Sequence, residues 1–72
     1  MVPIAGGMIE LGALLKLASR VQSGGEAKAL IQAGRVAVNG VVETRRHRQV
    51  RSGDTVTLTD GTEIVVAARG TR

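Results

Sequence analysis

The sequence predicts a small α+β domain in which two short N-terminal helices pack on an antiparallel β-sheet of about four strands. Three observations lead to this fold class. Apolar residues recur at helical spacing in the first half of the chain, and apolar and threonine residues alternate in the second half. Asn-Gly and Asp-Gly pairs, which favour tight hairpin turns, separate the alternating segments. The expected order is therefore helix, helix and then four short strands.

The first helix is expected over about residues 12–20, after a flexible tail over residues 1–8 that contains Pro3. On a helical wheel one broad apolar arc is formed by Leu11, Leu14, Leu15, Leu17, Ala18 and Val21. Lys16 and Arg20, four positions apart, fall together on the opposite side. That side is either a solvated back face or a two-point contact for phosphate.

The second helix has a start signal and a stop signal of its own. Ser23 is a good N-cap, and Glu26 three residues later is expected to complete a capping box by accepting from the N–H of Ser23. Its apolar face is formed by Ala27, Leu30 and Ile31. Gly34 is expected to end the helix in a left-handed conformation.

A first hairpin follows, with Val36 and Val38 on one strand and residues 41–42 on the other. Asn39-Gly40 predicts a type I′ turn between them, because that turn needs positive φ at both central residues. Residues 43–51 are the most basic segment, and the sequence leaves open whether they form a strand or a loop.

A second hairpin is expected from residues 55–59 and 62–68, with Asp60-Gly61 as another type I′ turn. A two-residue turn would place Val56 opposite Val65 and Leu58 opposite Glu63. Either Glu63 then lies at an exposed edge or the loop is longer than two residues. Residues 9–68 would thus form a single domain, followed by a flexible tail over residues 69–72.

The composition excludes several classes of function. The 72-residue chain has no cysteine, no aromatic residue and one histidine, His47, which is expected to be an exposed loop residue without a catalytic or metal-binding partner. We therefore expect no enzyme, no cofactor, no metal and no small-molecule substrate. RNA readers that stack bases on aromatic side chains are also excluded. Stability has to come from aliphatic packing, with a net value of roughly 3–5 kcal/mol.

Charge is unevenly distributed along the chain. The net charge is +4, but residues 20–51 carry seven bases against two acids, whereas residues 52–68 carry three acids and no base. Eight of the ten bases are arginine, whose planar fork binds phosphate or carboxylate in two places at once. This bias favours an anionic partner, and on charge alone a merely solvated surface is an equal alternative.

No secretion or membrane signal stands out in the sequence. Glu10 and Lys16 interrupt the apolar run over residues 8–18, which is too short to span a bilayer. We therefore expect no membrane partner and a cytoplasmic location.

The pattern resembles a known family, the bacterial RNA-binding domain named after ribosomal protein S-four and also called the αL motif. It is carried by Leu11, Leu14-Leu15-Lys16, Ser23, Glu26-Ala27-Lys28, Leu30-Ile31, Gly34, Val36, Val38 and Asn39-Gly40. Ile9-Glu10-Leu11 and Glu43-Thr44-Arg45-Arg46 bring it closer to the stand-alone YbcJ-like members, over about residues 9–67. The resemblance implies two helices on a small twisted sheet and a basic surface that contacts structured RNA.

Carried over by position, Ser23 and Lys28 match polar and basic positions of the family's helix, and Arg45-Arg46 match the basic pair of the stand-alone type. Two departures matter. Gly24 stands where many members have arginine, and Gly12-Ala13 stand where many have Asp-Lys. The surface is then expected to rely more on the other bases.

The sequence thus predicts a small, monomeric, non-catalytic protein that binds structured RNA through phosphates and shape, with the ribosome, rRNA or tRNA as candidate targets. The N–H groups of Gly24-Gly25 could contact a backbone phosphate, although these residues do not form a P-loop. The candidate RNA-binding residues are Lys16, Arg20, Ser23, Gly24, Gly25, Lys28, Arg35, Arg45, Arg46 and Arg48. The alternative is a protein-interaction module whose basic face docks an acidic partner or whose sheet edges accept a strand.

Overall fold

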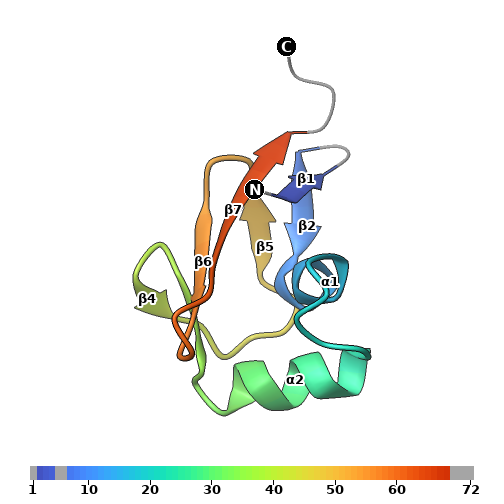
Figure 1. Ribbon diagram of the computed structural model, residues 1–72, viewed down its shortest axis with the longest axis vertical. Coiled ribbons are helices and arrows are strands. Elements are labelled where there is room, and N and C mark those ends of the chain that lie inside the picture. Colours follow the sequence, from blue (N-terminus) through green and yellow to red (C-terminus); the bar gives the residue numbers. More distant parts are fainter. Residues whose placement is uncertain (1, 5–6, 69–72) are drawn as a thin grey trace.

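The computed structural model describes residues 2–4 and 7–68 of the chain. Figure 1 shows both helices at one end of a set of short strands. In chain order the elements are β1 (Val2–Ile4), β2 (Met8–Glu10), α1 (Leu11–Leu17), α2 (Gly24–Gln32), β3 (Val36–Val38), β4 (Val41–Val42), β5 (Gln49–Arg51), β6 (Thr55–Leu58) and β7 (Glu63–Ala68). The predicted α+β class, with two helices and an antiparallel sheet, is confirmed.

The strands form two sheets. The larger has the order β1-β7-β6-β3-β4, in which β7, β6, β3 and β4 are antiparallel neighbours and β1 runs parallel to β7. The smaller sheet pairs β2 with β5 in antiparallel fashion, with Ile9 opposite Val50. The four antiparallel strands of the larger sheet are the four that the sequence predicted.

The segment over residues 1–8, predicted to be a tail, contains strand structure. Residues 2–4 form β1 on the free edge of β7, and Met8 begins β2. Pro3 is compatible with this position, because an edge strand tolerates a residue that has no N–H to donate. The tail predicted over residues 69–72 lies outside the described residues.

Helix α1 is shorter than the predicted 12–20 and begins one residue earlier. Its start is fixed from a distance, because the N–H groups of Leu11 and Gly12 donate to the carbonyls of Arg48 and Arg46 at 2.9 and 3.0 Å. Its end comes before Ser19, whose φ of 60° is left-handed and turns the chain toward α2. Only the apolar spacing of this helix was visible in the sequence.

Helix α2 follows its local signals closely. The N–H of Glu26 donates to Oγ of Ser23 at 3.1 Å, so the predicted N-cap is confirmed. The return bond differs by one residue, because Oε1 of Glu26 accepts from the N–H of Gln22 at 2.6 Å rather than from Ser23. Gly34 has a φ of 76°, as expected for the left-handed stop.

The two Gly-containing turns behave differently. Asn39 and Gly40 have φ of 52° and 84°, so the type I′ turn is confirmed. At the second turn Gly61 has a φ of 93° but Asp60 does not have a positive φ, so a type I′ turn there is wrong. Residues 59–62 form a longer loop instead, closed by a bond from the N–H of Leu58 to the carbonyl of Thr62 at 2.9 Å.

The longer loop resolves the register of the second hairpin. Val56 pairs with Ile64 and Thr57 with Glu63, so Leu58 no longer faces the carboxylate. Residues 43–51 combine both options that the sequence left open, because residues 43–48 are irregular and residues 49–51 form β5.

One aliphatic core joins the helices to the strands. Its buried members are Leu11, Leu14, Leu15, Val21, Ala27, Ile31, Val36, Val38, Val50, Val56, Leu58, Ile64 and Val66. No charged or polar residue among the described ones is buried. The basic residues therefore lie around this core, and the helices and loops decide on which side each of them is found.

Candidate nucleic-acid interface

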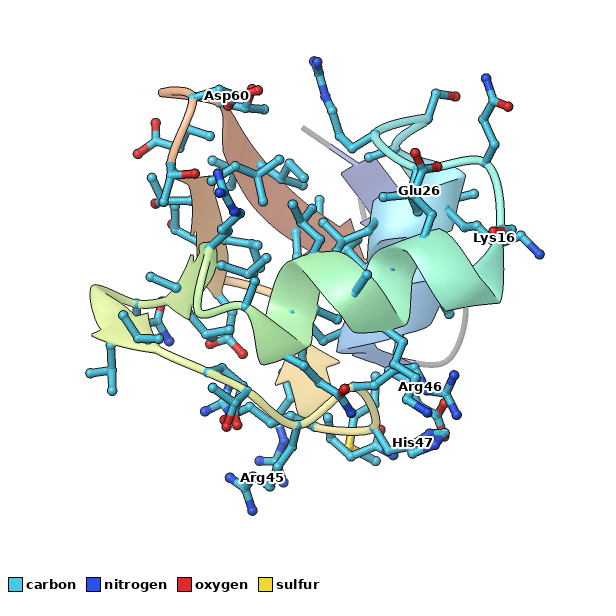
Figure 2. All side chains as sticks on the ribbon, turned by 90° about the horizontal axis from the view of Figure 1, so that it is seen from below. Lys16, Glu26, Arg45, Arg46, His47 and Asp60 are labelled. Carbon is cyan, nitrogen blue, oxygen red and sulfur yellow. The ribbon has the colours of Figure 1, made fainter. Side chains whose placement is uncertain are left out.

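The basic residues lie on two sides of α2. We call the first side the Arg46 face and define it by Lys16, Gly24, Lys28 and Arg46. The second side, the Arg35 face, is defined by Arg20 and Arg35. In Figure 2 Arg46 lies on one side of α2, and Lys16 lies near the start of this helix. Asp60 lies on the opposite side of α2. Arg20 and Arg35 line a hollow together with Asp60, so the Arg35 face is on that opposite side.

The Arg46 face surrounds a surface hollow of about 200 Å³. Its lining comes from the start of α1, the start of α2 and the loop before β5, namely Glu10, Gly12, Ala13, Lys16, Gly24, Arg46 and His47. Lys28 is exposed one helical turn after Gly24, which places it on the same side of α2. Two separate helices and one loop thus contribute bases to one place.

The loop over residues 43–48 is organised by Glu43. Its Oε2 accepts from the N–H groups of Thr44 and Arg45 and from Nε of Arg45, each at 3.0 Å. Its Oε1 accepts from Nη2 of Arg45 and lies 3.2 Å from Nε of Arg48. These bonds, first those from the Arg45 side chain, lower the pKa of Glu43 from 4.5 to about 2.

The same loop is fastened to α1. Its carbonyls at Arg46 and Arg48 accept the first N–H groups of the helix, at Gly12 and Leu11. The side chain of Arg46 lies directly over Gly12, where an added Cβ would be 2.8 Å from Cγ of Arg46. Gly12, a departure from the family's pattern, therefore provides the space that the Arg46 side chain occupies.

His47 is exposed, as expected, but it has partners. Its Nδ1 lies 3.0 Å from Oε1 of Glu10, and its Nε2 lies 3.3 Å from Nη2 of Arg46. His47 and Glu10 are 37 residues apart in the chain, so no local pattern in the sequence predicts this contact. The Glu10 carboxylate, which lines the hollow, is therefore in hydrogen-bond contact with the imidazole of His47.

The start of α2 completes the Arg46 face. The first N–H groups of any α-helix lack partners within the helix. At this helix start, Oγ of Ser23 accepts a hydrogen bond from the N–H of Glu26. The N–H groups of Gly24 and Gly25 therefore stand at the helix end. A Cβ added to Gly24 would meet nothing within 4 Å, so the protein leaves open space beside the hollow at this position.

The Arg35 face lines two hollows of its own. Arg20 and Arg35 line a hollow of about 350 Å³ together with Asp60, and both line a second one of about 290 Å³ together with Glu26. Hydrogen bonds from Thr62, with a smaller contribution from Arg20, lower the pKa of Asp60. Each of these two hollows thus contains one carboxylate, as the hollow of the Arg46 face contains Glu10.

The ten residues predicted from the sequence do not form one continuous site. Lys16, Gly24 and Arg46 line one hollow, and Lys28 lies one helical turn from Gly24, whereas Arg20 and Arg35 line other hollows. Ser23 and Gly25 lie beside Gly24 at the start of α2. Arg45 and Arg48 are ion-paired with Glu43. Sequence reasoning named Gly12, Glu10 and Glu43 for the family resemblance but gave them no place in the site, although an acid within an arginine run is a signal that could have revealed Glu43.

Two kinds of feature are absent from the part of the chain that the structure describes. Residues 2–4 and 7–68 contain no group of three or more histidine or acidic residues that could hold a metal ion. In the same residues no helix has the length and hydropathy needed to cross a membrane.

Comparison with known proteins adds three findings. Residues 2–67 match the family described as "S4 domain". A protein named "Putative RNA-binding protein YbcJ" from Escherichia coli (strain K12) is 42% identical over 59 residues, which cover 82% of this chain and 84% of the relative. A protein named "Probable ribosome maturation protein RlbA" from Bacillus subtilis (strain 168) is 45% identical over 51 residues, covering 71% and 72% of the two chains. This chain therefore belongs to the S4 domain family and is a YbcJ-like member of it.

Proposed function

We propose that this protein is a non-catalytic RNA-binding protein that holds the phosphate backbone of a structured RNA on its Arg46 face. The observation that carries the proposal is the hollow shared by Lys16, Gly24 and Arg46. Two cations from different elements and the open N–H end of a nine-residue helix converge there. A phosphate is the ligand that such a combination favours. The name of the Escherichia coli relative supports RNA as the partner.

The RNA is expected to be folded rather than single-stranded. Single-strand readers stack bases on aromatic side chains, and the sequence has none. Lysine, arginine and backbone N–H groups read the position of phosphates, so shape is what they can distinguish. The name of the Bacillus subtilis relative favours RNA of the ribosome as the target, and thus a role in the cytoplasm.

The first experiment compares a structured RNA, a duplex DNA and an unstructured single strand of equal length across a salt series. We expect a preference for the structured RNA and a slope of log affinity against log salt of about −3 to −5, since roughly four to six phosphates would be neutralised. Equal weak binding to all three would mean general cationic adhesion and would favour the protein-interaction alternative.

A pair of double variants tests which face binds. Replacing Lys16 and Arg46 with Gln should weaken RNA binding about tenfold or more and flatten the salt slope by about two. Replacing Arg20 and Arg35 with Gln removes the same charge from the Arg35 face and should weaken binding about threefold at most. Equal losses in the two double variants would contradict the assignment to the Arg46 face.

A further inference from the structure

We propose that Glu43, an acidic residue in the most basic segment, is a positioning residue for RNA binding. Its carboxylate holds the loop over residues 43–48 in the shape that presents Arg46 to the RNA. The inference rests on the proposed function, because it explains how the Arg46 face is kept in place. It goes beyond that function in assigning a role in binding to a group that carries the same sign of charge as the ligand.

The first step is that Glu43 is placed to act within the protein. Its side chain is only 13% exposed, whereas that of Arg45 is 77% exposed. Both carboxylate oxygens are occupied, by two backbone N–H groups and by the guanidinium groups of Arg45 and Arg48. A carboxylate held in this way is directed toward its own loop and away from a ligand on the surface.

The second step connects the carboxylate to Arg46. Glu43 fixes Arg45, directly before Arg46, and Arg48, two residues after it. Its own N–H donates to the carbonyl of Val36 at 2.9 Å, which ties the loop to β3. The carbonyls of Arg46 and Arg48 then reach α1. Arg46 is thus held between two anchors, one on Glu43 and one on the first turn of α1.

The third step concerns the charge that Glu43 compensates. Nη1 of Arg48 is buried and has no hydrogen-bond partner among the described residues. Glu43 is the carboxylate that forms an ion pair with this guanidinium, at Nε, while Asp54 adds a weaker attraction from nearby. A glutamine at position 43 would keep one acceptor oxygen but direct an amide N–H group toward an arginine. The loop would then lose both its charge balance and part of its hydrogen bonding.

Charge alone predicts the opposite effect of a substitution. Glu43→Gln raises the net charge from +4 to +5, which by long-range attraction should strengthen RNA binding. If Glu43 positions the loop, the same substitution should weaken binding by about fivefold or more, the size of one ordinary lost hydrogen bond. The two explanations therefore differ in the sign of the change.

Glu63→Gln is the matched control. Glu63 is exposed at the start of β7 and makes no ion pair within residues 2–4 and 7–68. It follows the β6–β7 loop, whose Asp60 lies across α2 from Arg46 (Figure 2). This variant makes the same change in charge and should strengthen binding by about twofold or leave it unchanged.

The experiment measures affinity for the structured RNA at a temperature at which thermal melts show every variant to be folded. Glu43→Asp is included because it keeps the charge but shortens the side chain by one methylene. It should weaken binding by about twofold to threefold if position matters. Stronger binding by Glu43→Gln, together with unchanged binding by Glu43→Asp, would overturn the proposal.

A double-mutant cycle separates positioning from a general loss of stability. In the Glu43→Gln background, Arg46→Gln should have less effect than in the wild type, because Arg46 is already misplaced. Lys16→Gln, on α1, should keep its full effect in that background. Equal effects of Arg46→Gln in both backgrounds would contradict the inference. If the wild-type protein fails to bind RNA at all, the proposed function fails first, and the two failures are thereby distinguished.

Discussion

The Arg46 face and the Arg35 face are built from similar residues but differ in what their carboxylates contact. On the Arg46 face Glu43 is turned into the loop by Arg45, and Glu10 is engaged by His47. On the Arg35 face Glu26 and Asp60 accept from the backbone N–H groups of Gln22 and Thr62 and make no ion pair within the described residues. The comparison teaches that two surfaces with similar bases can differ in whether side chains or the backbone hold their carboxylates.

The largest expected effect comes from unfolding the domain, which would disrupt both faces at once. Ile31 is fully buried on α2, between the two faces. Ile31→Ala should lower the free energy of unfolding by about 3 kcal/mol, because it leaves a cavity in a light core. Denaturant unfolding measures the loss, which is close to the whole stability expected for a domain of this size. RNA binding that survived in the unfolded variant would show that the bases act without the fold.

A smaller effect should be confined to the Arg46 face. Gly12→Ala would place a Cβ 2.8 Å from Cγ of Arg46 and 3.5 Å from its carbonyl oxygen. We expect a net loss of about 1 kcal/mol in stability, since the steric cost exceeds the gain in helix propensity. RNA affinity should fall as Arg46 is displaced, whereas the Arg35 face should keep its NMR chemical shifts. Shifts spread evenly over both faces would remove the distinction between them.

Local signals in the sequence predicted the parts of the fold that depend on near neighbours. The bounds of α2 are set by Ser23, Glu26 and Gly34. The turn between β3 and β4 is set by Asn39-Gly40. Each of these signals acts within a few residues. Asp60-Gly61 carries a similar turn signal, but the register of the strands imposes a longer loop there.

The candidate site was harder to predict, because it depends on contacts between distant segments. The sequence identified the bases, yet it could not tell on which side of α2 each would lie. The partner of His47 and the carbonyls that cap α1 come from elements far apart in the chain. The role of Gly12 follows only from the position of Arg46 above it.

Acid titration should distinguish the carboxylates of the two faces. The pKa of Glu43 is lowered from 4.5 to about 2, so its contribution to stability is complete above pH 4.5 and disappears as the pH falls toward 2. The pKa of Asp60 is also lowered, and its contribution is lost in the same direction. Urea unfolding across this range should show a fall in stability that Glu43→Gln flattens more than Asp60→Asn. A greater flattening by Asp60→Asn would place the stronger carboxylate contacts on the Arg35 face.

The smallest expected effect on stability comes from a variant that should be more stable but bind RNA more weakly. Gly24→Ala should raise the free energy of unfolding by about 0.5 kcal/mol, because the residue is helical and its Cβ meets open space. The added methyl would obstruct the approach of a phosphate, so RNA affinity should fall. Gly25→Ala is the control, since Gly25 does not line the hollow of the Arg46 face. Equal binding by both variants would exclude a close approach at Gly24.

The attachment of α1 to the loop before β5 has a consequence for folding. A helix of seven residues is unstable alone, and the carbonyls that close its first turn belong to residues 46 and 48. The cap of α2 and the β3–β4 turn act within a few residues, so we expect these parts to be ordered earlier and α1 to be completed late. Among the hydrogen-bonded amides, Leu11 and Gly12 should then exchange fast. Bound RNA should slow that exchange, because it would hold together the last part of the molecule to assemble.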